Sequence, residues 1–215
     1  MFKVLQHLIT SFFIFPLLAI AAEPVPLSET SYKADLGVLI MQINWGRQWK
    51  CGAFENAQLQ ALSFTKLSAF AEQAVSIEFH TPSRLLVENK FLPYAWVVEP
   101  GEYFLSGFDV KVARSVRNVA HIQGNKDNLF KEGKPIGGSF TVKPGEIVYI
   151  GHFGLDCGAE PFLWRYYLAD RQEFESYIKG FREKFPFVKY ISVQYRLFSS
   201  EVFGHPFSLS YPTVK

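Results

Sequence analysis

Apolar residues along most of this chain are spaced as in β-strands. Segment 75–79 alternates strictly, with Val75, Ile77 and Phe79 on one face. Segment 36–45 is a continuous apolar run rich in branched side chains, which predicts a strand buried on both faces. Looser alternation predicts two further strands, at 59–67 and 190–198.

Two segments share one pattern, in which Pro-Gly-Glu separates two apolar runs. The centres are Pro100-Gly101-Glu102 and Pro144-Gly145-Glu146. Proline presets φ at the first central position of a type II turn, and glycine accepts the positive φ of the second. The repeat predicts two similar turns, each linking neighbouring strands. The predicted strand pairs are 94–98 with 102–112, and 138–142 with 146–153.

Only one segment has clear helical spacing. Its apolar stripe consists of Phe174, Tyr177, Ile178, Phe181 and Phe185. Asp170 and Glu173 have the spacing of a capping box, and Pro186 ends the pattern. The sequence therefore predicts an amphipathic helix near 170–185 that packs on the protein's own sheet.

Eight or nine strands with tight turns and one late helix predict a mainly β protein. We expect an antiparallel β-sandwich with one C-terminal amphipathic helix packed on it, and the transthyretin-like (prealbumin-like) arrangement is one version. Segment 121–138 is rich in Gly, Asn and Lys, which favours a surface loop. The tail from Ser199 is expected to be irregular.

The first 21 residues have the pattern of a secretory signal peptide. Lys3 precedes an apolar run at 8–18, and small residues follow at Ala19 and Ala21. Cleavage near Ala21 would leave one domain, 22–215, in the periplasm or outside the cell. No other apolar run is long enough to span a bilayer, so we expect no transmembrane span in the mature chain.

Charge and cysteine content narrow the function further. Without Lys3 the net charge falls from +2 to about +1, and the absence of a coherent basic face argues against nucleic-acid binding. The two cysteines, Cys51 and Cys157, favour a disulfide in an oxidising compartment. Free buried thiols and a catalytic thiol remain the alternatives.

Candidate catalytic chemistry is sparse. The histidines of the mature chain, His80, His121, His152 and His205, include no two within five residues, so no local metal pair exists. We expect no metal, no cofactor and no catalytic residue. A site assembled in space from His152, Asp156 and Cys157 is the basis for one alternative, a hydrolase.

Exposed aromatic rings are the remaining candidates for ligand binding. Aromatic residues make up 17% of the chain, and most are expected in the core. Flat aromatic faces can also stack on sugar rings. The candidate ligand-binding residues are Trp45, Trp49, Trp164 and Tyr166.

Residues 94–157 resemble a class of uncharacterised bacterial exported β-sandwich proteins. The resemblance rests on Val-Glu-Pro-Gly-Glu-Tyr-Phe-Leu at 98–105 and on the run from Gly137 to Gly151, which contains the second Pro-Gly-Glu. Relatives carry paired Pro-Gly hairpins and are often lipoproteins, whereas no cysteine follows the leader here. The resemblance implies a bacterial envelope setting and transfers no catalytic residue.

These observations favour an exported, non-catalytic β-sandwich that acts through contacts with an unknown protein or envelope component. A glycan-binding or small-ligand-binding module is the second hypothesis. The hydrolase is the third.

Overall fold

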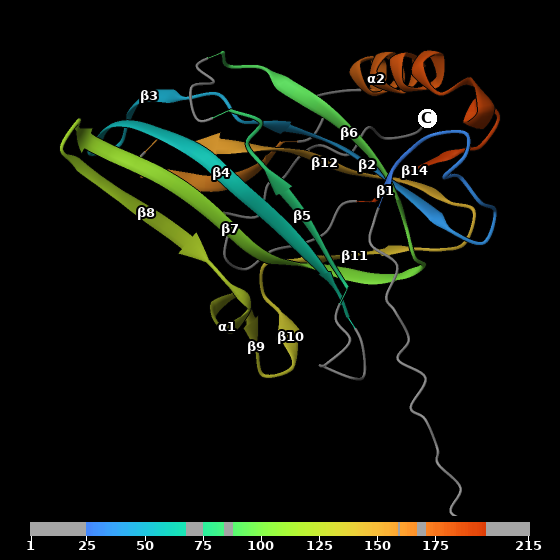
Figure 1. Ribbon diagram of the computed structural model, residues 1–215, viewed down its shortest axis with the longest axis horizontal. Coiled ribbons are helices and arrows are strands. Elements are labelled where there is room, and N and C mark those ends of the chain that lie inside the picture. Colours follow the sequence, from blue (N-terminus) through green and yellow to red (C-terminus); the bar gives the residue numbers. More distant parts are fainter. Residues whose placement is uncertain (1–24, 68–74, 84–87, 159, 167–170, 197–215) are drawn as a thin grey trace, which may run out of the picture.

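The computed structural model describes residues 25–67, 75–83, 88–158, 160–166 and 171–196, which form two six-stranded sheets, a small β-ribbon and a long helix (Figure 1). Sheet A has the strand order β1-β6-β2-β12-β13, with β14 also paired to β12. Sheet B has the order β11-β7-β4-β3, with β5 beside β4 and β8 beside β7.

The strands of sheet A are β1 (Val25–Pro26), β2 (Gly37–Asn44), β6 (Phe91–Val98), β12 (Ile147–Asp156), β13 (Phe162–Tyr166) and β14 (Val193–Tyr195). Those of sheet B are β3 (Gln48–Cys51), β4 (Phe54–Lys66), β5 (Ser76–His80), β7 (Gly101–Ser115), β8 (Asn118–Gly124) and β11 (Ser139–Val142). The other elements are α1 (Lys126–Leu129), β9 (Phe130–Lys131), β10 (Lys134–Pro135), α2 (Arg171–Lys184) and the 3-10 turn η2 (Pro186–Val188).

The mainly β prediction is confirmed, and the strongest patterns match strands closely. The run at 36–45 becomes β2, buried along nearly its whole length, and the alternating segment 75–79 becomes β5. The predicted surface loop at 121–138 is partly regular, because β8 extends to Gly124 and α1, β9 and β10 follow. Of the predicted strand at 190–198, residues Val193–Tyr195 form β14, and residues 197 and 198 lie outside the described part of the chain.

Pairing directions differ between the two sheets. All ladders of sheet B are antiparallel, as expected. Sheet A is mixed, because β12 runs parallel to both β2 and β14. Parallel pairing requires a crossover between the paired strands. Between β12 and β14 the crossover consists of β13, α2 and η2, and between β2 and β12 it consists of the elements from β3 to β11.

One hydrophobic cluster contains side chains of both sheets. Leu39, Met41 and Ile43 of β2 join Leu59, Leu62 and Phe64 of β4 in it. The rings of Phe64 in sheet B and Phe153 in sheet A meet edge to face, with centroids 5.5 Å apart. The apolar faces of the two sheets therefore share a core.

The two Pro-Gly-Glu segments cross between the sheets, which corrects the prediction that each links neighbouring strands. The first connects β6 of sheet A to β7 of sheet B, and the second connects β11 of sheet B to β12 of sheet A. They lie side by side, because Val142 pairs with Gly101. Gly145 has the expected positive φ of 70°. Apolar periodicity cannot distinguish a hairpin from a crossing, since both keep the apolar residues facing the same core.

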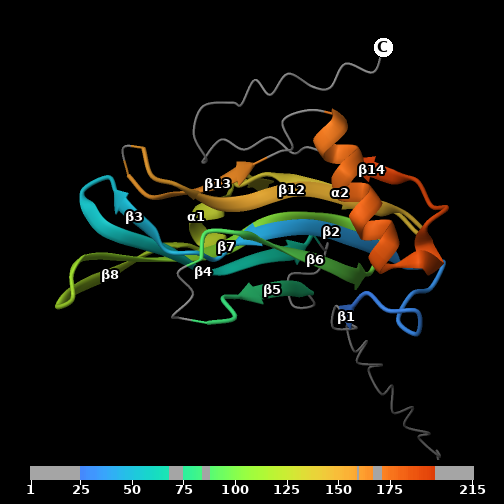
Figure 2. The ribbon, with the colours of Figure 1, turned by 90° about the horizontal axis from the view of Figure 1, so that it is seen from above.

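The predicted helix is present as α2, and its apolar stripe packs on sheet A. Ile178 and Phe181 are buried in a second cluster with Val38 and Ile40 of β2 and Tyr149 of β12. Seen from above, α2 lies across the outer face of sheet A (Figure 2). The sequence predicted that this helix is the C-terminal element, and this is wrong, because η2 and β14 follow it. The predicted cap, Asp170, lies outside the described residues.

The predicted disulfide is confirmed between Cys51 and Cys157, whose Cα atoms are 4.4 Å apart. Cys51 ends β3 in sheet B, and Cys157 follows β12 of sheet A. The bond therefore ties the two sheets together at one end. The predicted signal peptide at 1–21 and the tail from Ser199 lie outside the described residues. No helix within the described ranges is long and apolar enough to cross a membrane.

Candidate functional site

A cleft of about 280 Å³ lies between α2 and the outer face of sheet A. Its sheet side comes from β2 and β6, and its helix side from two parallel rows of α2. The lining residues are Gln42, Pro93, Tyr94, Ala95, Ser176, Tyr177, Gly180, Phe181, Lys184 and Phe185. Its size lies near the lower limit of small-molecule sites, and its mainly apolar lining with a few polar groups is typical of them.

Helical spacing explains how α2 forms its side of the cleft. Residues four apart lie on the same helix face, so Ser176, Gly180 and Lys184 form one row. The row between Tyr177 and Phe185 passes through Phe181 and packs against the sheet. The two rows span about 12 Å, because each helical residue adds about 1.5 Å.

Gly180 keeps the middle of the cleft open. A Cβ atom built there would have no heavy atom within 4 Å outside its own helix backbone. Glycine in a helix interior is less favourable than alanine by about 1 kcal/mol. Gly180 is itself exposed, so a side chain at this position would project from the rim of the cleft without meeting another residue.

The polar groups of the cleft are unequally distributed. Gln42 and Ser176 are uncharged, and Lys184 is the only charged residue in the lining. The Lys184 ammonium lies 5.4 Å from the ring centre of Phe185. Within the part of the chain that the structure describes, no acidic side chain lines this cleft. Its charge is therefore positive and lies at the C-terminal end of α2.

His152 lies behind the other end of the cleft. It pairs in register with Gln42, and its ring centre is 5.5 Å from that of Tyr177. Tyr149 and Phe91 complete the aromatic surroundings, with ring centres at 5.6 and 5.1 Å. His152 is only 7% exposed, and no hydrogen-bond partner for Nε2 occurs among the described residues.

A β-bulge in β12 explains why the two rings meet. The register with β2 shifts between Tyr149 and His152, where Gly151 adopts a φ of 114°. Residues three apart in a regular strand face opposite sides, but the extra residue of a bulge restores the same side. Gly151 therefore allows His152 to join Tyr149 under α2.

Burial determines the protonation states in this aromatic group. Desolvation lowers the pKa of His152 to about 4, so the imidazole is neutral at neutral pH. Burial also raises the pKa of the Tyr177 hydroxyl above its ordinary value, so the phenol is uncharged. This end of the cleft thus carries no charge, in contrast to the Lys184 end.

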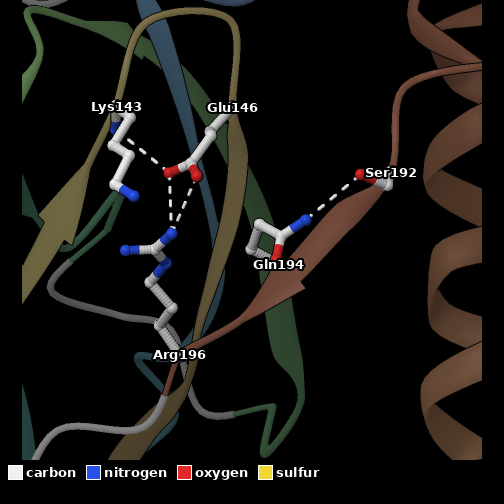
Figure 3. A network of polar contacts seen from close by, with 5 residues as sticks. All are labelled: Lys143, Glu146, Ser192, Gln194 and Arg196. Carbon is white, nitrogen blue, oxygen red and sulfur yellow. Dashed lines mark hydrogen bonds and ion pairs between the residues drawn. The ribbon is translucent and has the colours of Figure 1, made fainter.

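A second, more open groove of about 670 Å³ lies on another side of α2, against η2 and β14. Both signs of charge line it, because Lys179, Arg182 and Lys189 lie there with Glu175 and Glu183. Arg196, the residue after β14, anchors this strand near its end. Its Nη2 atom lies 2.8 and 2.9 Å from the two carboxylate oxygens of Glu146 (Figure 3). Mixed charge and open shape make this groove the weaker candidate.

The structure separates the four predicted ligand-binding residues. Trp45 is fully buried and donates its indole N–H to Tyr94 Oη at 2.7 Å, so it is a core residue and cannot present a face to a ligand. Trp49 is 56% exposed, and the Arg47 guanidinium lies 5.5 Å from its ring centre. Trp164 and Tyr166 belong to β13, and their side chains lie outside the described part of the structure.

The alternative hydrolase site of His152, Asp156 and Cys157 lacks its thiol nucleophile. Cys157 is bonded to Cys51 and has no free thiol. A different histidine–carboxylate pair occurs on sheet B, where His121 Nδ1 lies 2.8 Å from Asp109 Oδ1 in a polar hollow. Among the described residues that line this hollow, only Thr81 carries a hydroxyl, and that hydroxyl donates to the carbonyl oxygen of Ser83 at 3.0 Å. The described residues also contain no group of three or more potential metal ligands.

Sequence reasoning missed the cleft. The helix stripe was visible, but the signals for an open site were two glycines in regular elements, Gly180 in the helix and Gly151 in a strand. Comparisons of the chain with protein-family models, curated proteins and solved structures gave no match.

Proposed function

We propose that the protein is an exported, non-catalytic β-sandwich that binds a small, largely apolar ligand in the cleft between α2 and sheet A. The observation that carries the proposal is the cleft itself, which is lined mainly by apolar side chains of the helix and sheet and has the exposed row of Ser176, Gly180 and Lys184 at its rim.

Three features support the exported sandwich. The leader pattern at 1–21 and the Cys51–Cys157 bond both suit an oxidising compartment such as the periplasm or the extracellular space. The shared core of sheets A and B suits a sandwich, with α2 as an added layer. Action through an envelope or protein partner stays a prediction alongside ligand binding.

Filling the cleft is expected to abolish binding of an uncharged apolar probe. N-phenyl-1-naphthylamine is such a probe, and its fluorescence rises when it leaves water. Gly180→Trp places an indole in the open space, so we expect its affinity for the probe to fall at least tenfold. Titration of the purified, disulfide-intact protein measures this.

Two control variants separate blocking from unfolding. Gly180→Ala adds only a methyl group, so it should retain probe binding and raise helix stability by up to about 1 kcal/mol. Lys179→Trp adds the same indole at an exposed position of α2 that lines the second groove and not the cleft, so it should bind the probe as the wild type does. Equal probe affinity of Gly180→Trp and the wild type, with unchanged circular dichroism, would refute the proposal.

A further inference from the structure

The polarity of the cleft restricts the chemistry of its ligand. Lys184 lies at one end, and the uncharged Tyr177 and Gln42 lie at the other. Between them, Gly180, Phe181 and Ala95 present apolar surface. A molecule that matches this order has one anionic group, an apolar body and no charge at its far end.

The lysines of the two grooves differ in their ion pairing. The second groove contains Lys179, which lies 3.9 Å from Glu183 within the same helix. Lys184 has no ion-pair partner among the described residues, and its surroundings in the cleft contain no acidic side chain that would repel an anion. Lys184 is exposed at the rim of the cleft, so an ion pair with a bound anion there would be partly screened by water.

The deep end of the cleft determines the orientation of such a ligand. His152, Tyr149 and Tyr177 form a packed aromatic group there. A carboxylate placed at that end would be desolvated without a cation to pair with, which is costly. An apolar chain placed there would contact ring surfaces instead.

Resting on the proposed function, we infer that the ligand is a single-chain monoanionic amphiphile, such as a medium-chain carboxylate, whose head group pairs with Lys184 and whose apolar chain runs past Gly180 toward Tyr177. The helix side of the cleft, about 12 Å long, accommodates an extended chain of this class.

Competition with the apolar probe tests the inference. Octanoate and 1-octanol have the same chain length and differ in the charge of the head group. We expect octanoate to displace N-phenyl-1-naphthylamine from the wild type at a concentration roughly two- to fivefold lower than octanol, the range expected for one ion pair with an exposed lysine. Lys184→Gln should remove that preference and leave displacement by octanol unchanged. Lys179→Gln, which removes the same charge outside the cleft, should leave both unchanged.

The possible outcomes separate the two proposals. Equal potency of octanoate and octanol, or no effect of Lys184→Gln on octanoate, would overturn the anionic ligand class while ligand binding in the cleft stands. The same effect from Lys179→Gln as from Lys184→Gln would also overturn it, because the attraction would then be a general property of the basic surface. Failure of the probe to bind, or binding that Gly180→Trp does not affect, would overturn the proposed function itself.

Discussion

Replacing both cysteines, Cys51→Ala with Cys157→Ala, is expected to lower the free energy of unfolding by about 4–5 kcal/mol. The bond joins residues 106 apart, so its loss releases a long loop in the unfolded chain. It also releases the end of β3 in sheet B from the segment after β12 in sheet A. Urea unfolding of the oxidised wild type and of the double variant measures the difference.

Reduction of the wild type is the matched control for this prediction. Added dithiothreitol should bring the wild type to the stability of the double variant and leave the variant unchanged. A double variant within about 1 kcal/mol of the oxidised protein would show that the bond contributes far less than loop closure predicts. The disulfide would then not be a major source of the stability of the two-sheet fold.

Lowering the pH from 7 to 4.5 is expected to cost roughly 2–3 kcal/mol of stability through His152 alone. The folded-state pKa is about 4, below the ordinary value of 6.5, because burial disfavours the charged ring. In this pH range the unfolded chain binds the proton more readily than the folded protein. The contribution of His152 is therefore fully present above pH 6.5 and is lost as the pH falls toward 4.

The variant His152→Phe isolates this contribution, because a phenyl ring suits the surrounding aromatic side chains and does not titrate. Its stability should fall by roughly 2–3 kcal/mol less than that of the wild type over the same pH interval. His80→Gln removes an exposed imidazole and should retain the wild-type pH dependence. Identical pH profiles of His152→Phe and the wild type would contradict the burial of an unpaired, neutral His152.

The sequence predicted those parts of the fold that depend on local patterns. β2, β5 and α2 occur close to their predicted positions, because each has a clear apolar period over its length. The sequence did not predict which strands belong to which sheet. The turn at Pro144-Gly145 was predicted correctly, whereas Gly101 has a φ of 159° and already belongs to β7, so the predicted type II turn is not formed there. The crossing of both segments between sheets depends on long-range packing that local periodicity does not contain.

The candidate site was harder to predict than the fold. Trp45 was selected for its aromatic ring, and its ring is the part that the core buries. Gly180 and Lys184 carry the proposed site, yet glycine and lysine on a helix are ordinary when read singly. Their significance comes from the position of α2 over β2 and β6, which no local pattern specifies.

Amide chemical-shift mapping with octanoate tests the central claim most directly. Addition of octanoate to the isotope-labelled, disulfide-intact protein should shift amide signals of residues lining the cleft, including Gln42, Ala95, Gly180 and Lys184. Signals of the polar hollow on sheet B, such as that of His121, should stay in place. Shifts confined to sheet B or to the surroundings of Trp49, with none along α2, would contradict a ligand site between the helix and sheet A.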